Sequence, residues 1–278
     1  MLCRSIGLFL IVVVVFCNVD DLAVATGAPW EMIDEGLFYA EFAPGRGAAG
    51  DDGQILVLKI DPDLYEFKLL CASQAGHGNL TVKQWCERYE LLGAINAGMY
   101  QQDYASNVGY MKNYGYINNR HVSSRYHSVA AFHPVDSTRQ EFRIHDIDEE
   151  NMKEIMAGYH SIIQNLRLIK RPAQNRWPQQ EKRWSEAALG EDAQGNALFI
   201  FCRQPFSMHD LNNILITLPI DIACAQHLEG GPEASLYFSS KGKVIEAMGS
   251  YETGLTESLG NSHYWAIPNV IGFVKKQG

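Results

Sequence analysis

Short apolar runs that suit β-strands recur along most of the chain, each bounded by turn-forming residues. They occupy Leu37–Phe42, Gln54–Ile60, Tyr65–Ala72, Leu92–Asn96, Val129–Phe132, Phe142–His145, Ala197–Cys202, Leu236–Phe238, Lys243–Glu246 and Val270–Lys275. Helical spacing of apolar residues is rarer and predicts helices at Thr81–Tyr89, Glu150–Met156 and Met208–Leu215. Strands outnumber helices and do not alternate with them. The pattern therefore predicts an α+β fold with a mixed, mostly antiparallel sheet core, and not a doubly wound parallel sheet.

The N-terminus differs from the rest of the chain. Arg4 precedes an unbroken apolar run over residues 6–17, and a small-x-small sequence ends at Ala25. This order is typical of a secretory signal peptide, and the run is too short for a stable membrane span. We predict a signal peptide over residues 1–25, an exported protein, periplasmic or secreted, and one domain over residues 26–278, since no linker divides that stretch.

The net charge limits the expected binding partners, and the cysteine content bears on whether disulfides form. The chain has 23 basic and 32 acidic residues, a net charge of −9, so neither nucleic acid nor an anionic membrane is an expected partner. After residue 25 there are four cysteines without C-x-x-C spacing: Cys71, Cys86, Cys202 and Cys224. Export would permit one or two disulfides, but the apolar surroundings favour buried free thiols. Sequence motifs for nucleotide binding, zincins and α/β-hydrolases are absent.

The stretch His227–Pro232, HLEGGP, is the first candidate site. Gly230 and Gly231 would let the backbone approach a ligand, and their N–H groups could face an anion. On a strand, His227 and Glu229 would lie on one side, so that the acid could orient the imidazole. The alternative is a plain glycine-rich turn with a solvated Glu229.

Three other features suggest ligand contacts. Asn96 ends an apolar strand, and its amide suits sugar recognition, although a simple turn would also explain it. Residues 167–183 carry six basic side chains against one acid, which suits an anionic substrate or else a solvated loop. The six are Arg167, Lys170, Arg171, Arg176, Lys182 and Arg183. Glu186 opens an apolar segment, and taken alone it is most simply an exposed acid at a strand end. The scattered histidines lack the spacing of a metal site.

Taken in this order, the segments resemble the phosphodiester glycosidase family over about residues 36–274. The family pattern Ile-Asn-Gly-Gly-Phe-Phe is similar to Ile95–Tyr100, and Gln-x-x-Pro-x-Leu is similar to Gln164–Ile169 without its proline. Arg-Thr-Ala-Ile-Gly falls on Glu186–Gly190, and Asn-Leu-Asp-Gly-Gly falls on His227–Gly231. The chain departs from the family where Glu186 replaces the arginine and where His227 and Glu229 replace the asparagine and the aspartate.

The resemblance implies cleavage of the bond between an anomeric carbon and a phosphodiester oxygen. The leaving group would be a phosphate monoester with a second pKa of about 6, so protonating it is less demanding than in ordinary glycosidases. We expect Glu229 to act as nucleophile or general base, with His227 as its orienting partner or proton shuttle and Glu186 as a second carboxylate beside them. The expected substrate contacts are Asn96, Arg167, Arg183, Gly230 and Gly231.

Two alternatives remain open from the sequence. A non-catalytic protein that binds an anionic glycan would explain why the family arginine and aspartate are both replaced. A metal-dependent phosphodiesterase would break the P–O bond instead, with Glu186 and Glu229 as ligands of a divalent metal. The glycosidase itself requires no cofactor, and its partner would be a sugar phosphodiester.

Overall fold

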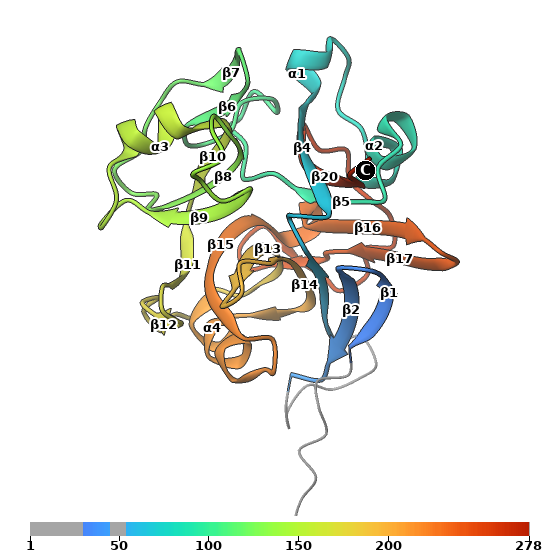
Figure 1. Ribbon diagram of the computed structural model, residues 1–278. Coiled ribbons are helices and arrows are strands. Elements are labelled where there is room, and N and C mark those ends of the chain that lie inside the picture. The colour runs from blue at the N-terminus through green and yellow to red at the C-terminus, as the bar shows by residue number, and fades with distance from the viewer. Residues whose placement is uncertain (1–29, 45–53, 278) are drawn as a thin grey trace, which may run out of the picture.

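The computed structural model describes residues 30–44 and 54–277, so the predicted signal peptide lies outside the described residues. The strands form three mostly antiparallel sheets and helices are few, which confirms the predicted α+β class in a single domain (Figure 1). Among the described residues no helix is long and apolar enough to cross a membrane.

The largest sheet carries the segments predicted to hold the site. Its strands follow the order β1 (Glu31–Asp34), β2 (Leu37–Phe42), β3 (Ile55–Ile60), β14 (Ala197–Phe206), β13 (Trp184–Asp192), β15 (Ile222–Gly230), β11 (Arg167–Lys170) and β12 (Gln174–Asn175). The short strand β18 (Tyr251–Glu252) is added beside β13 and pairs in turn with β19 (Thr256–Glu257).

Two five-stranded sheets complete the fold. The second has the order β7 (Tyr116–Asn119), β6 (Met111–Asn113), β10 (Tyr159–Asn165), β8 (Ser128–Pro134) and β9 (Phe142–Asp146). The third has the order β17 (Lys243–Met248), β16 (Ser235–Ser240), β5 (Gly93–Asn96), β20 (Asn269–Lys275) and β4 (Tyr65–Cys71). The helices are α1 (Ala72–Ala75), α2 (Val82–Tyr89), α3 (Met152–Gly158), α4 (Met208–Thr217) and the 3-10 turn η2 (Gly231–Glu233).

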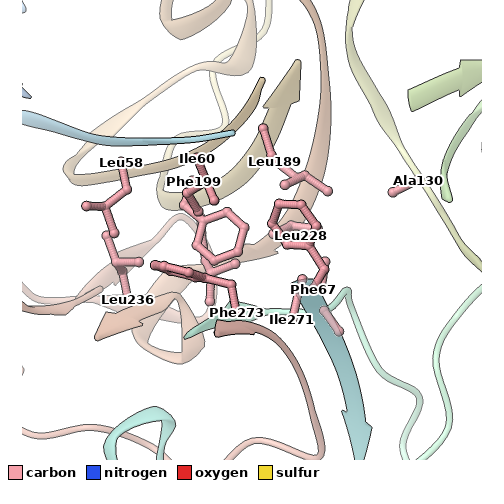
Figure 2. Packing of buried hydrophobic residues seen from close by; sticks show 14 of the residues in the cluster. Leu58, Ile60, Phe67, Ala130, Leu189, Phe199, Leu228, Leu236, Ile271 and Phe273 are labelled. Carbon is pink, nitrogen blue, oxygen red and sulfur yellow. The ribbon is translucent and has the colours of Figure 1, made fainter. Parts of the chain in front are cut away.

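The core lies where the sheets face one another. Alternate residues of β4 are buried, as expected of a strand with one face on the core. Figure 2 shows Phe199 of β14 against Phe273 of β20, with ring centres 5.7 Å apart, and Phe67 of β4 beside them. The chain then passes from β15 of the largest sheet through η2 directly into β16 of the third. This connection makes η2 the corner at which two sheets meet.

The predicted helices are confirmed, and their ends follow the capping rules. The side chain of Thr81 accepts a hydrogen bond from the Gln84 backbone N–H, and Gln84 returns one to Thr81, so α2 begins with a capping box. Ser207 caps α4 in the same way through Asp210 N–H. Asn151 caps α3, which therefore begins two residues later than the predicted Glu150.

Two expectations about buried residues have different outcomes. All four described cysteines are free and buried, as the apolar surroundings indicated, and they form no disulfide with one another. The interpretation of Glu186 as an exposed strand-end acid is wrong, because its side chain is fully buried within β13. Nearly every residue of β13 is buried on both faces, since the strand lies at the centre of the largest sheet.

Candidate functional site

The candidate site lies at the corner formed by the end of β15 and the turn η2. Strand β13 pairs with β15 so that Glu186 faces Gly230 and Ala187 faces Glu229 across the ladder. Strand β5 reaches the same corner from the third sheet, because it pairs with β16 immediately after η2. Segments far apart in the sequence therefore converge here.

A buried carboxylate holds the histidine in place. His227 Nδ1 lies 2.7 Å from Glu186 Oε1, and Trp184 Nε1 donates to Glu186 Oε2 at 2.7 Å. The Trp184 ring also meets His227 edge-on, with centroids 6.2 Å apart. Because Nδ1 is committed to Glu186, the opposite ring nitrogen, Nε2, points away from Glu186 and is the one available to a substrate.

The Glu186–His227 pair binds its proton tightly. Burial by itself would lower the pKa of His227, but the nearby carboxylates of Glu186 and Glu229 outweigh it and raise that pKa. Burial likewise raises the pKa of the Glu186 carboxyl. The pair therefore behaves as one unit that shares a proton between Nδ1 and Oε1.

Glu229 is the acid of the site. Its Oε1 accepts a hydrogen bond from the Gly230 N–H at 3.0 Å, and the side chain is only partly exposed. Burial raises the pKa of Glu229 to about 8, with His227 opposing the shift and Glu233 adding to it. Glu229 is therefore protonated at neutral pH and can donate a proton.

Three residues that the sequence analysis did not identify complete the site. Burial raises the pKa of Tyr100, and the charges of Glu229 and Glu233 raise it further, so this phenol stays neutral beside them. Glu252 and Glu233 face Gly231, since a Cβ there would lie 2.8 Å from Glu252 Oε2 and 3.6 Å from Glu233 Oε2. Glu233 follows Glu229 by only four residues, so the sequence could have indicated it. Glu252 is distant in sequence and reaches the site only because β18 pairs with β13.

Burial raises the pKa of both Glu233 and Glu252. The site therefore collects four carboxyl groups around one imidazole, and several of them keep their protons at a pH where free glutamate is ionised. Gly231 has φ +66°, a left-handed conformation that only glycine adopts without strain. A side chain at this position would also displace the Glu252 carboxyl group and would contact that of Glu233.

Asn96 is placed as a positioning residue. It is almost fully buried, and its Nδ2 donates to the Glu233 carbonyl at 3.0 Å. Its Oδ1 accepts from the Ser235 N–H at 2.8 Å. Both polar ends of the amide are therefore engaged by the backbone at the C-terminal end of η2, so Asn96 anchors this turn.

We expect Asn96→Ala to lower the free energy of unfolding by about 2 kcal/mol, because a buried carbonyl and a buried N–H lose their partner. Turnover should fall as well, since the turn that carries Glu233 loses its anchor. Urea unfolding followed by circular dichroism measures the first effect. A change below about 0.5 kcal/mol, the range of ordinary surface substitutions, would show that the turn holds itself in place.

Fewer side chains of the basic segment, residues 167–183, lie at the candidate site than the sequence suggested. Arg167 donates to both Asp146 and Asp148 through Nη1, at 2.6–2.8 Å. Arg183 is exposed and borders a surface hollow with Tyr251 and Thr253. The exposed Lys182 is the member of the segment whose charge acts on Glu252.

The two glycines of the motif also differ in role. The Gly230 N–H is occupied by Glu229, and a Cβ at Gly230 would meet Trp184 Cδ1 at 2.7 Å, so this glycine makes room for the indole. Among the described residues, no three His, Cys, Asp or Glu side chains have an arrangement that could hold a metal ion.

The raised pKa of Glu229 gives a stability prediction. A carboxyl that keeps its proton in the folded state up to about pH 8 but loses it near 4.5 when unfolded destabilises the fold progressively as pH rises between those values. The upper limit is about 5 kcal/mol at about 1.36 kcal/mol per pKa unit, and we expect roughly 2 kcal/mol because the group is partly solvated.

Glu229→Gln removes this titration. The free energy of unfolding of the variant, measured in urea relative to the wild type, should therefore increase by roughly 2 kcal/mol between pH 5 and pH 8.5, because only the wild type loses stability over this range. A difference that stays constant with pH would mean that Glu229 titrates normally.

Comparison with known proteins places this geometry in context. A sequence profile of the phosphodiester glycosidase family matches residues 89–274, which include every residue of the site. No curated protein sequence matches the chain. Among solved structures, the catalytic domain of zebrafish N-acetylglucosamine-1-phosphodiester alpha-N-acetylglucosaminidase, auto-inhibited by its pro-peptide, is similar with a TM-score of 0.58 and 13% identity. That match covers 86% of this chain and 82% of the zebrafish chain.

Two bacterial structures share the same fold. A hypothetical protein from Synechocystis has a TM-score of 0.59 at 13% identity, over 91% of this chain and 65% of the other. A protein from Burkholderia pseudomallei K96243, provisionally described as exported, has a TM-score of 0.51 at 10% identity, over 80% and 74% of the two chains.

Proposed function

Since this chain belongs to the phosphodiester glycosidase family, we propose that it is an exported hydrolase that cleaves the glycosidic bond of a sugar-1-phosphodiester. The observation that carries the proposal is the position of Glu229, whose pKa is raised by burial to about 8, beside a histidine held by the buried carboxyl group of Glu186. Such a group can supply a proton to a leaving oxygen at neutral pH. The sequence of the motif suggested a nucleophile or base at Glu229, whereas the raised pKa of this residue favours an acid in the resting enzyme.

The proposed reaction has two proton transfers. Glu229 gives its proton to the phosphodiester oxygen as the bond from that oxygen to the anomeric carbon breaks, and a phosphate monoester leaves. A water molecule then attacks the oxocarbenium-like carbon and returns its proton to the Glu229 carboxylate, so the enzyme is restored and one water is consumed.

The Glu186–His227 pair supports this cycle electrostatically. The positive charge of His227 lowers the pKa of Glu229, which makes proton donation easier and stabilises the carboxylate formed in the first step. Asn96 takes part indirectly, because it anchors the turn next to Glu229. The neutral phenol of Tyr100 is a further hydrogen-bond donor at this corner.

Hydrolysis in ¹⁸O-labelled water tests the reaction type. The purified protein is incubated with several sugar-1-phosphodiesters, and both products are analysed by mass spectrometry. We expect the label in the sugar, because C–O cleavage adds water to the anomeric carbon. Label in the phosphate would indicate a metal-dependent phosphodiesterase, and no turnover of any substrate would favour the non-catalytic binding protein for an anionic glycan.

Export is proposed on separate grounds. The apolar N-terminal run and the small residues before Thr26 support it, as does the description of the similar Burkholderia protein. We expect cleavage near Ala25, which N-terminal sequencing of the protein recovered outside the cytoplasm would detect. Recovery of a form that begins at Met1 from the cytosol would contradict export.

A further inference from the structure

The loop between β5 and β6 carries a pair of tyrosines whose rings are in contact. Tyr100 lies four residues after the end of β5, and the charges of Glu229 and Glu233 both act on its phenol. Tyr104 lies at the tip of the loop, and its ring centre is 5.9 Å from that of Tyr100, with 44° between the ring planes. The two rings therefore form one aromatic surface that extends outward from the candidate site.

Tyr104 is exposed although its side chain is large and its backbone is strained. The side chain is 66% exposed, whereas that of Tyr100 is only partly exposed. The backbone of Tyr104 has φ +55°, a left-handed conformation that a bulky residue rarely adopts. Glycine or asparagine would fit this backbone with less strain, so the fold itself does not require a tyrosine here. Strained positions of this kind cluster at ligand sites.

The backbone of the loop tip is held by hydrogen bonds that do not involve the Tyr104 side chain. The Tyr104 N–H donates to the Gln101 carbonyl at 2.9 Å, and Asn79 Nδ2 donates to the Tyr104 carbonyl at 2.8 Å. Asn269 Nδ2 donates to the next carbonyl, that of Ala105, at 3.1 Å, and Asn269 begins β20, which pairs with β5. The ring is therefore presented from a fixed backbone, which reduces the entropy that is lost when a ligand binds.

The face of an aromatic ring selects the kind of group that can stack on it. This face carries partial negative charge, so it repels phosphate oxygens and attracts C–H groups. In a sugar-1-phosphodiester only the sugar necessarily has a ring with a face of C–H groups, and its hydroxyls project around the edge of that ring. A sugar can therefore stack on the tyrosines while its hydroxyls stay hydrogen-bonded to water or to polar groups of the site.

We propose that Tyr104 and Tyr100 form the sugar-binding platform of the candidate site, on which the sugar ring of the substrate stacks. The identity of the ligand rests on the proposed function, whereas the position of the platform rests on the loop that carries the two rings. Tyr104 contacts the sugar and takes no part in proton transfer. Its loss should therefore weaken substrate binding and leave the chemical step intact.

Steady-state kinetics of Tyr104→Asn, with the substrate identified by the labelling experiment, test this role. Asparagine removes the ring and adopts a left-handed backbone readily, so the loop should keep its conformation. We expect KM to rise about tenfold, which corresponds to roughly 1.4 kcal/mol, while kcat changes by less than about twofold. Tyr104→Phe keeps the ring face and should have the KM of the wild type.

Tyr114→Asn is the matched control. Tyr114 is also a tyrosine with a left-handed backbone, at φ +50°, and its side chain is 50% exposed. It lies in the turn between β6 and β7, where its ring stacks on that of His160 with centres 5.0 Å apart. The same substitution at this position should leave both KM and kcat at the values of the wild type.

Saturation-transfer difference NMR provides a readout that needs no turnover. The probes are the methyl α-glycosides of glucose, galactose, mannose and N-acetylglucosamine, which carry a sugar ring but no phosphate. We expect transfer to the ring C–H groups of at least one glycoside in the wild type and in Tyr114→Asn. Most of this transfer should be lost in Tyr104→Asn and kept in Tyr104→Phe.

Three results would overturn the inference: an unchanged KM in Tyr104→Asn, an equal rise of KM in Tyr114→Asn, or no transfer to any of the glycosides in the wild type. Hydrolysis of a substrate with unchanged KM in Tyr104→Asn would reject the platform and leave the proposed function standing. Glycosides that bind in a way that depends on Tyr104, without hydrolysis of any sugar-1-phosphodiester, would reject the hydrolase and retain the platform.

Discussion

We expect Glu229→Gln to lower turnover of a sugar-1-phosphodiester by at least about 10²-fold while the protein stays folded and still binds its substrate. Glutamine keeps the size of the side chain, and its amide oxygen can still accept from the Gly230 N–H. It cannot give up a proton to the leaving oxygen or take one from water. The change should therefore appear in kcat far more than in KM, and steady-state kinetics with the substrate identified by the labelling experiment would measure it.

Two further variants make this prediction specific. Glu229→Asp should also be impaired, because it withdraws the carboxyl group by roughly 1 Å, and misplacement of that size at a reacting centre can cost about 10²-fold. Glu257→Gln, an exposed acid on β19, is the matched control and should keep wild-type turnover. Full activity in both Glu229 variants would exclude this residue from the chemistry.

The second large effect concerns stability. We expect His227→Ala to lower the free energy of unfolding by about 3–5 kcal/mol, the range for breaking a buried ion pair by removing one partner. Glu186 would remain fully buried with only Trp184 as a partner. Urea unfolding at pH 7 would measure the loss.

A double-mutant cycle separates this coupling from lost packing. Glu186→Gln in the His227→Ala background removes the buried charge, so the double variant should be more stable than His227→Ala alone. Glu191→Gln is not a suitable control for this cycle, because Glu191 forms ion pairs with Arg143 and Arg171. If the two single effects simply add, the contact between Glu186 and His227 contributes no coupling energy, and the shared-proton description fails.

Half of the described strands, ten of 20, were predictable because the physical signal is local. Leu37–Phe42 coincides with β2, and the predicted Val270–Lys275 agrees with β20 to within one residue, since each run is apolar and ends at turn-forming residues. Ten of the described strands escaped prediction, among them β10 and the two strands at the centre of the largest sheet, β13 and β15. Both faces of these three strands are buried, so the alternation that identifies a half-exposed strand is missing.

Some contacts of the candidate site were likewise predictable from the local sequence, whereas others were not. Spacing alone brought His227 and Glu229 together, because two residues apart on a strand means the same side. Spacing could not show that Glu186, 41 positions earlier, bonds to His227, or that β18 brings Glu252 to Gly231. For the same reason, the sequence could predict that arginines of the basic segment bind an anion, but it could not predict where in the fold these arginines lie.

The sequence by itself determined the fold class, the family, half of the strands, three of the four described α-helices and the identity of the motif that carries Glu229. Tertiary structure alone decided the raised pKa of that acid, the partner of the histidine and the pairing of Arg167 with Asp146 and Asp148. The physical reason is that apolar periodicity and capping act between near neighbours along the chain. Desolvation and charge pairing depend on which distant strands become adjacent, and here the pairing of β13 with β15 determines both.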